Sequence, residues 1–156
     1  MKTSKDKLVL LQTEMAELEL AAEHLRYSLA RCADLPEFNA LSLEQLERLE
    51  SLTSRFARLS DLLIQRIFRL VDSIELNDTG SILDRLYRAE KRGWANADTF
   101  IQIRELRNLI AHEYASEAMS EIYLNVKELS STLLTLLPKV GQTTDTLLVT
   151  HIWKAQ

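Results

Sequence analysis

Residues 104–114 bring two arginines, an amide, an imidazole and a phenol into one short segment, and side chains of these types bind and process phosphate. The segment reads Arg-Glu-Leu-Arg-Asn-Leu-Ile-Ala-His-Glu-Tyr. The guanidinium of Arg107 can neutralise a phosphoryl oxygen through paired hydrogen bonds, and His112 can both give and take a proton near neutral pH. Cleavage of RNA by its own 2′-hydroxyl needs both functions, so this is the chemistry that the segment fits.

The spacing within the segment limits how a single helix could use it. At about 100° per residue, Arg107 and His112 differ by about 140° around an ideal helix. Arg104, Asn108 and His112, by contrast, follow one stripe. We therefore expect either that the helix ends or bends before His112, or that a second copy of the chain completes the site. A two-fold dimer would supply two histidines, one as base and the other as acid.

Two long helices are predicted ahead of this segment. Apolar residues recur every three or four positions over residues 5–31 and again over residues 42–75. Pro36 interrupts the pattern between them, and Ser42 with Gln45 has the spacing of a capping box at the start of the second helix. A short connection predicts that the two helices run antiparallel.

Three shorter elements and a tail are predicted to follow. Ser81 and Asp84 mark the start of a helix that Gly93 ends, another helix begins near residue 98 and contains the segment 104–112, and a fifth begins at residue 116. Pro138 is predicted to close the fifth helix, and residues 143–153 are rich in β-branched and aromatic side chains without a helical period. The sequence thus predicts an all-α protein, with an antiparallel four-to-five-helix bundle in residues 1–138 and a non-helical, extended C-terminal tail in residues 139–156.

The net charge of −4 is unevenly distributed along the chain. Residues 55–107 hold ten Lys and Arg, nine of them Arg, against eight Asp and Glu, and the segments on either side are net acidic. This charge distribution argues against a protein that binds nucleic acid over its whole surface. The charged residues between 84 and 92 either form a solvated helix face or extend a groove for RNA. Of these two interpretations we favour the solvated face.

The remaining composition predicts a cytoplasmic protein without a membrane span or a metal site. No run approaches the roughly 18 apolar residues that cross a bilayer, and the first residues are too polar for a signal peptide. The lone Cys32 cannot form an internal disulfide. Together with His24 and His151 it shows no metal-ligand spacing, so we expect no metal.

The segment 107–114 matches the pattern R-x4-H-x-Y through Arg107, His112 and Tyr114. This pattern resembles the signature of HEPN toxins of the HepT type. The two long helices, residues 81–93 (Ser-Ile-Leu-Asp-Arg-Leu-Tyr-Arg-Ala-Glu-Lys-Arg-Gly) and residues 103–108 also look like that family. The resemblance covers about residues 8–137 and implies a HEPN-like bundle, with the tail outside it.

The resemblance also implies an activity and partners. HepT-like proteins are toxins of toxin-antitoxin systems, and they act as metal-independent endoribonucleases on cellular RNA such as tRNA or mRNA. They form homodimers in which the R-x4-H pair lines a cleft at the subunit interface. The implied roles are proton transfer for His112, phosphate or transition-state binding for Arg107, and a supporting or RNA-binding role for Arg104 and Asn108.

The expected antitoxin is a minimal nucleotidyltransferase (MNT). In some family members it transfers AMP from ATP to the motif tyrosine, which corresponds to Tyr114 here. No cofactor is expected for the chain itself, since only the partner would use ATP. Two other functions stay open. The chain could be a non-catalytic subunit that binds a nucleotide or the substrate of a nucleotidyltransferase complex, or it could be an assembly module.

Overall fold

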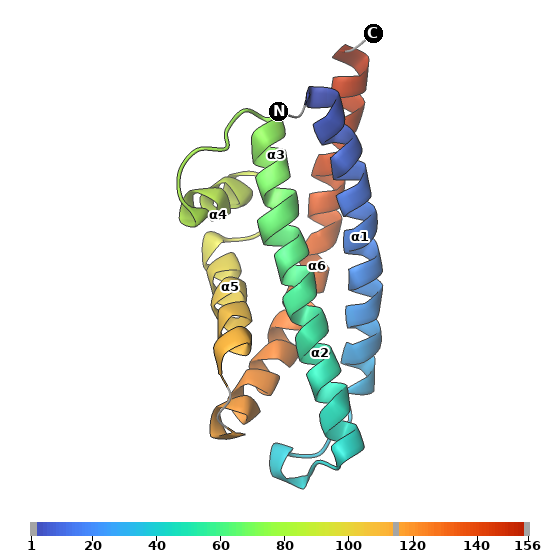
Figure 1. The fold of residues 1–156 in the computed structure, drawn as a ribbon, viewed down its shortest axis with the longest axis vertical. Helices are drawn as coiled ribbons and strands as arrows, with labels where there is room; N and C mark the ends of the chain where they lie inside the picture. Colours follow the sequence, from blue (N-terminus) through green and yellow to red (C-terminus); the bar gives the residue numbers. More distant parts are fainter. Residues whose placement is uncertain (1–2, 114–115, 155–156) are drawn as a thin grey trace.

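Two long antiparallel helical rods form the centre of the molecule (Figure 1). The computed structural model describes residues 3–113 and 116–154, and none of these residues lies in a strand. The first rod is α1 (Ser4–Arg31). The second consists of α2 (Leu43–Asp61), the π-helical segment η2 (Leu62–Phe68) and α3 (Arg69–Ile74) in one continuous run. The predicted all-α fold is confirmed.

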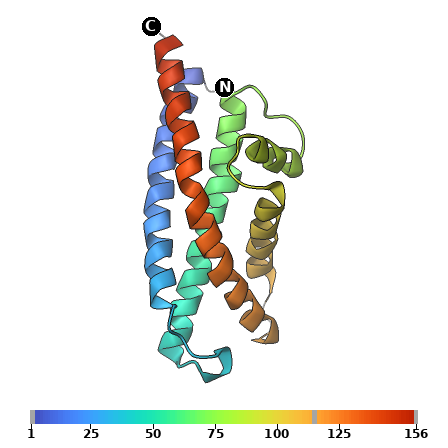
Figure 2. The same cartoon turned by 180° about the vertical axis from the view of Figure 1, so that it is seen from behind.

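The remaining helices pack against these rods. The short 3-10 turn η1 (Phe38–Ala40) joins the rods, while α4 (Ile82–Lys91) and α5 (Ala97–His112) lie along one side of the second rod. The last helix, α6 (Ser116–Lys154), packs on α1, α2 and α5. Figure 2 shows α6 returning across the back of the bundle to the end where the chain starts. In the part of the chain that is described, each helix is either too short or too polar to cross a bilayer.

Local sequence signals explain where two of the helices begin. The Ser42 hydroxyl accepts from the backbone N–H of Gln45, and the Gln45 side chain accepts from the backbone N–H of Ser42 at 2.9 Å. Ser81 and Asp84 form the same reciprocal pair at the start of α4. The predicted capping box at Ser42 and the predicted helix start at Ser81 are both confirmed. Each reciprocal pair satisfies N–H groups that a helix start leaves without partners.

An aromatic cluster joins the connection between α4 and α5, α5 itself and α6 to the second rod. The ring centroid of Phe68 lies 4.8 Å from that of Trp94 and 5.0 Å from that of Phe100, and all three side chains are buried. The Trp94 indole N–H donates to the Thr143 hydroxyl on α6 at 2.9 Å. This bond satisfies the polar end of a buried ring and ties the C-terminal half of α6 to the bundle.

The prediction of a non-helical tail is wrong for residues 139–154. Pro138 lies inside α6, which continues through Lys154. Proline removes one helical hydrogen bond, which disfavours but does not forbid a helix that is held by packing. Leu136, Leu137 and Val140 are buried around this point, and Thr144 is buried one turn later. Burial of this face outweighs the β-branched composition that suggested an extended segment.

The π-helical segment η2 changes the face that the second rod presents. Leu62, Leu63 and Ile64 are buried in succession, so this part of the rod is covered on more than one face. A π-helix has wider turns than an α-helix, and such segments occur often at functional sites. Here the wider turns directly follow Asp61, at the point where α5 packs beside the rod.

Candidate functional site

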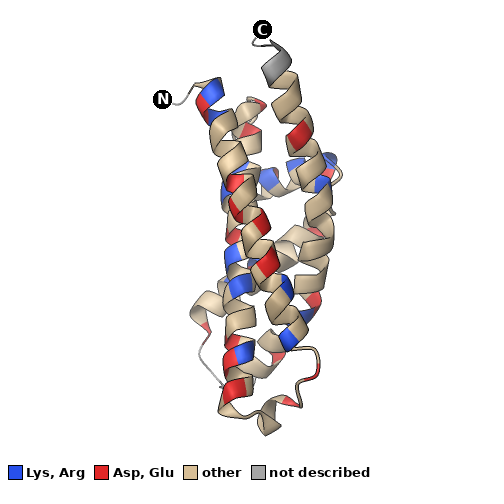
Figure 3. Ribbon diagram, turned by 90° about the vertical axis from the view of Figure 1, so that its right-hand side faces the viewer, with Lys and Arg blue, Asp and Glu red and all other residues tan. Residues whose placement is uncertain are grey.

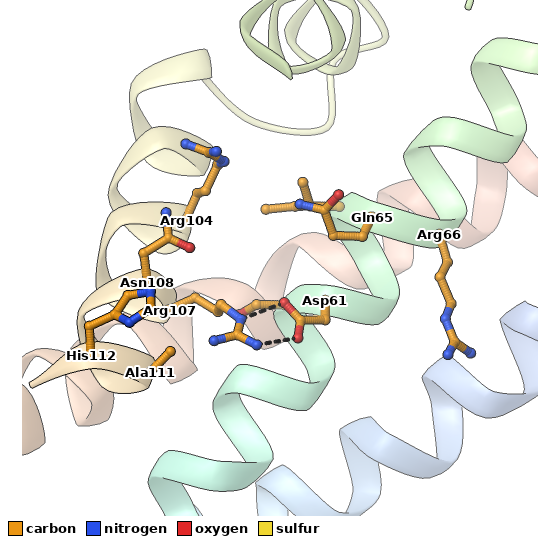
Figure 4. Close-up of a pocket in the computed structure, with 10 residues that line it drawn as sticks. Asp61, Gln65, Arg66, Arg104, Arg107, Asn108, Ala111 and His112 are labelled. Atoms are coloured by element: carbon orange, nitrogen blue, oxygen red, sulfur yellow. Dashed lines mark hydrogen bonds and ion pairs between the residues drawn. The ribbon is translucent and has the colours of Figure 1, made fainter. Parts of the chain in front are cut away.

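An open pocket of about 460 Å³ lies between α5 and the junction of α2 with η2 (Figure 4). We refer to it as the α2–α5 pocket. Its lining residues are Ser60, Asp61, Ile64, Gln65, Arg66, Arg104, Arg107, Asn108, Ala111 and His112. Four of the five residues singled out from the sequence therefore line one cavity.

Packing of α5 explains why these polar side chains face the pocket. Phe100, Ile103 and Leu106 are buried against the core and fix the rotation of the helix. With that rotation, Arg104, Asn108 and His112, which are spaced four residues apart, line the opening together.

Arg107 is held by Asp61 in a two-pronged ion pair. Its Nε lies 2.7 Å from Asp61 Oδ1 and its Nη2 lies 2.9 Å from Oδ2. The hydrogen bonds to Asp61 raise the pKa of the Arg107 guanidinium, so this group stays cationic. A guanidinium carries five N–H groups, and this pairing uses two of them. The third nitrogen points away from Asp61 in Figure 4, so donors remain for a ligand oxygen.

His112 is the last residue of α5 and its side chain is exposed. The helix neither ends nor bends before it, because the backbone N–H of Glu113 still donates to the Leu109 carbonyl at 2.9 Å and the chain becomes extended only at Glu113. Of the two arrangements expected from helical phase, the first is therefore not found. Arg107 instead reaches sideways to Asp61, and His112 borders the same pocket from the helix end.

The other predicted residues differ in their surroundings. Arg104 is half-buried, and its Nε is buried without a hydrogen-bond partner among the described residues. Asn108 is exposed between Arg104 and His112. Tyr114, the predicted modification site, lies outside the described residues.

The α2 and η2 side of the pocket was not foreseen from the sequence. Asp61, Gln65 and Arg66 come from positions that a helical stripe marks only as polar. Gln65 points toward α5, whereas Arg66 turns toward α1 and lies 3.6 Å from Glu14 (Figure 4). Asp61 could have been predicted only if the helix that packs on α5 were known. Local sequence patterns do not give that information.

Two further observations concern metal ions and similar proteins. Within residues 3–113 and 116–154, no three His, Cys, Asp or Glu side chains gather closely enough to hold a metal ion. No protein-family model matches the chain, and neither a curated protein nor a solved structure matches it.

Proposed function

We propose that the chain is a toxin endoribonuclease that cleaves cellular RNA in the α2–α5 pocket without a metal ion. One observation carries the proposal. Arg104, Arg107, Asn108 and His112 line a single open pocket, and Asp61 fixes Arg107 there. The resemblance of residues 107–114 to the HepT-type motif supports the same reading.

The proposed reaction is attack by a ribose 2′-hydroxyl on the neighbouring phosphorus. A base takes the 2′-hydroxyl proton, the 2′-oxygen bonds to phosphorus, and the bond from phosphorus to the 5′-oxygen breaks as an acid protonates that oxygen. The products are a 2′,3′-cyclic phosphate and a 5′-hydroxyl. The free N–H groups of Arg107 would stabilise the added negative charge on phosphorus.

A two-fold dimer would complete this site. One His112 can act as base or as acid at a given moment, so a second imidazole is needed for the other proton. His112 lies exposed at the end of α5, and Leu109 one turn earlier is 43% exposed. These features suit an interface in which the partner's His112 approaches the same phosphate.

The nuclease is tested with purified protein and a labelled RNA in excess EDTA. Cleavage that persists in chelator, leaves cyclic phosphate ends and stops when the nucleotide at the cut carries a 2′-deoxyribose supports the proposed reaction. His24→Ala, which removes an exposed histidine on α1, is the matched control for His112→Ala. Binding of RNA or a nucleotide without any cleavage would favour the non-catalytic subunit instead.

We further propose that a nucleotidyltransferase antitoxin restrains the toxin by moving AMP from ATP to the Tyr114 hydroxyl, with release of pyrophosphate. A bulky anion two positions after His112 would repel an RNA backbone from the pocket. Mass spectrometry after incubation with the partner and ATP should show added AMP that Tyr114→Phe abolishes and Tyr27→Phe, at an exposed tyrosine of α1, retains. Modification that survives Tyr114→Phe would place it elsewhere.

A further inference from the structure

A second polar cavity of about 190 Å³ lies between α3 and the start of α4. We call it the α3–α4 cavity. Its lining residues are Arg69, Asp72, Ser73, Asp78, Gly80, Ser81, Arg85 and Arg88. Three arginines around a space of this size are an unusual concentration of charge for a chain whose net charge is −4.

The acidic residues of the cavity do not balance these arginines. Asp72 is fully buried, and its carboxylate oxygens lie 2.9 Å from Arg88 Nη2 and 2.8 Å from Arg92 Nη2. Its single charge is thus shared by two cations from α4. Asp78 is the other acid, and it is exposed at the rim.

In the described part of the chain, neither Arg69 nor Arg85 forms an ion pair with an acidic side chain. Within the described residues, the side chain of Arg69 forms no ion pair or hydrogen bond. Arg85 donates only to neutral oxygens at long range, the Ile64 carbonyl at 3.4 Å and Gln65 Oε1 at 3.5 Å. Burial lowers the pKa of the Arg85 guanidinium, Asp72 raises it, and the neighbouring cations Arg69 and Arg88 lower it again. An incoming anion would relieve this unfavourable burial of charge.

The α3–α4 cavity continues from the α2–α5 pocket along the second rod. Gln65 lines the α2–α5 pocket and accepts the Arg85 hydrogen bond, so it connects the two cavities. Gln65 and Arg69, one turn apart, also both line a groove between α1 and the second rod. From Asp61 to Arg69 the rod advances eight residues, or roughly 12 Å. At about 3.4 Å per nucleotide of a stacked strand, this corresponds to about three to four nucleotides.

We infer that Arg69 and Arg85 form a phosphate subsite that holds the RNA backbone about three to four nucleotides from the bond cleaved in the α2–α5 pocket. The inference rests on the proposed nuclease function. Guanidinium groups suit phosphate oxygens because their planar N–H groups form paired hydrogen bonds. Acidic residues follow one another along α1, the helix that starts at the N label in Figure 3, and would repel RNA from that side.

The test compares two substrates of different length. The first is a 16-nucleotide RNA with a mapped cleavage site, and the second is the tetranucleotide centred on that site, which is too short to reach Arg69. Arg69→Glu is the informative variant because the Arg69 side chain is exposed and loses no hydrogen bond or ion pair to any residue that the structure describes. Arg26→Glu is the matched control, since it makes the same charge change at an exposed arginine of α1 that lines none of the cavities described above.

We expect Arg69→Glu to lower kcat/KM for the 16-nucleotide RNA roughly tenfold, to flatten its salt dependence, and to leave kcat/KM for the tetranucleotide unchanged. Arg26→Glu should change neither substrate by more than about twofold. Arg85→Ala should repeat the length-dependent loss, and unfolding curves establish that it is folded.

Four results would overturn the inference. An Arg69→Glu enzyme that cleaves the long RNA normally, or one that loses both substrates equally, has no backbone subsite at Arg69. Millimolar inorganic phosphate that binds to wild type but not to Arg69→Glu, without a length-dependent loss of cleavage, would assign the cavity to a free phosphate. If wild type cleaves neither RNA, the nuclease function itself fails, and the subsite with it.

Discussion

Replacement of Asp72 by Asn tests how α4 is held on the bundle. The substitution keeps the size of a fully buried side chain but leaves Arg88 and Arg92, which are only 14% and 11% exposed, without their shared anion. Removing one partner of a buried ion pair costs about 3–5 kcal/mol. Arg92 also lies 3.5 Å from Glu75, and Arg88 also donates to the Thr79 carbonyl at 3.0 Å. These contacts place the expected loss at the lower end, about 3 kcal/mol.

Thermal unfolding measures this loss directly. For a chain of this size, 1 kcal/mol shifts Tm by about 2–4 °C, so Asp72→Asn should lower Tm by about 6–12 °C. Glu17→Gln is the matched control, because Glu17 and Arg58 are 3.9 Å apart and their side chains are 48% and 59% exposed. Its shift should stay within about 2 °C. Equal shifts in the two variants would refute the claim that Asp72 anchors α4.

Gly141→Ala should raise Tm by about 1–4 °C, because an added Cβ in α6 meets nothing within 4 Å. Gly80→Ala should lower Tm, since Gly80 has a φ of +93° and its Cβ would collide with the Asp84 carboxylate. Burial raises the pKa of the Cys32 thiol above its ordinary value of 9.0, so its contribution to stability is present below that value and is lost as pH rises through the folded-state pKa. Wild-type Tm should therefore fall more steeply than that of Cys32→Ala as the pH rises above 9.0. Asp61→Asn should lower kcat/KM for RNA about tenfold in cleavage kinetics by misplacing the Arg107 guanidinium.

Local signals were sufficient to predict most of the fold. The apolar stripe placed the long rods, and the capping boxes at Ser42 and Ser81 placed two helix starts. The same kind of signal wrongly predicted a helix end at Pro138, because a proline and β-branched residues affect only the local conformational preference of the chain. The bond between Trp94 and Thr143, 49 residues apart, shows the tertiary packing that outweighed it.

The candidate site likewise has a part that could be predicted from local sequence patterns and a part that could not. The stripe of Arg104, Asn108 and His112 follows from helical spacing alone, and these residues do line one pocket. Asp61 could not be found because its role depends on a contact with Arg107, 46 residues away, beside a π-helical segment that no local pattern indicated. Helical phase suggested that Arg107 and His112 were awkward partners. In the structure Arg107 reaches sideways to Asp61, and His112 borders the same pocket from the helix end.

The most direct test of the central claim is the rate at which wild type and His112→Ala cleave the same RNA in EDTA, measured side by side with both proteins shown to be folded. We expect wild type to cut the RNA and His112→Ala to be slower by at least about 100-fold. Absence of cleavage by the unmodified wild-type protein, or equal rates for the two proteins, would contradict the proposed function.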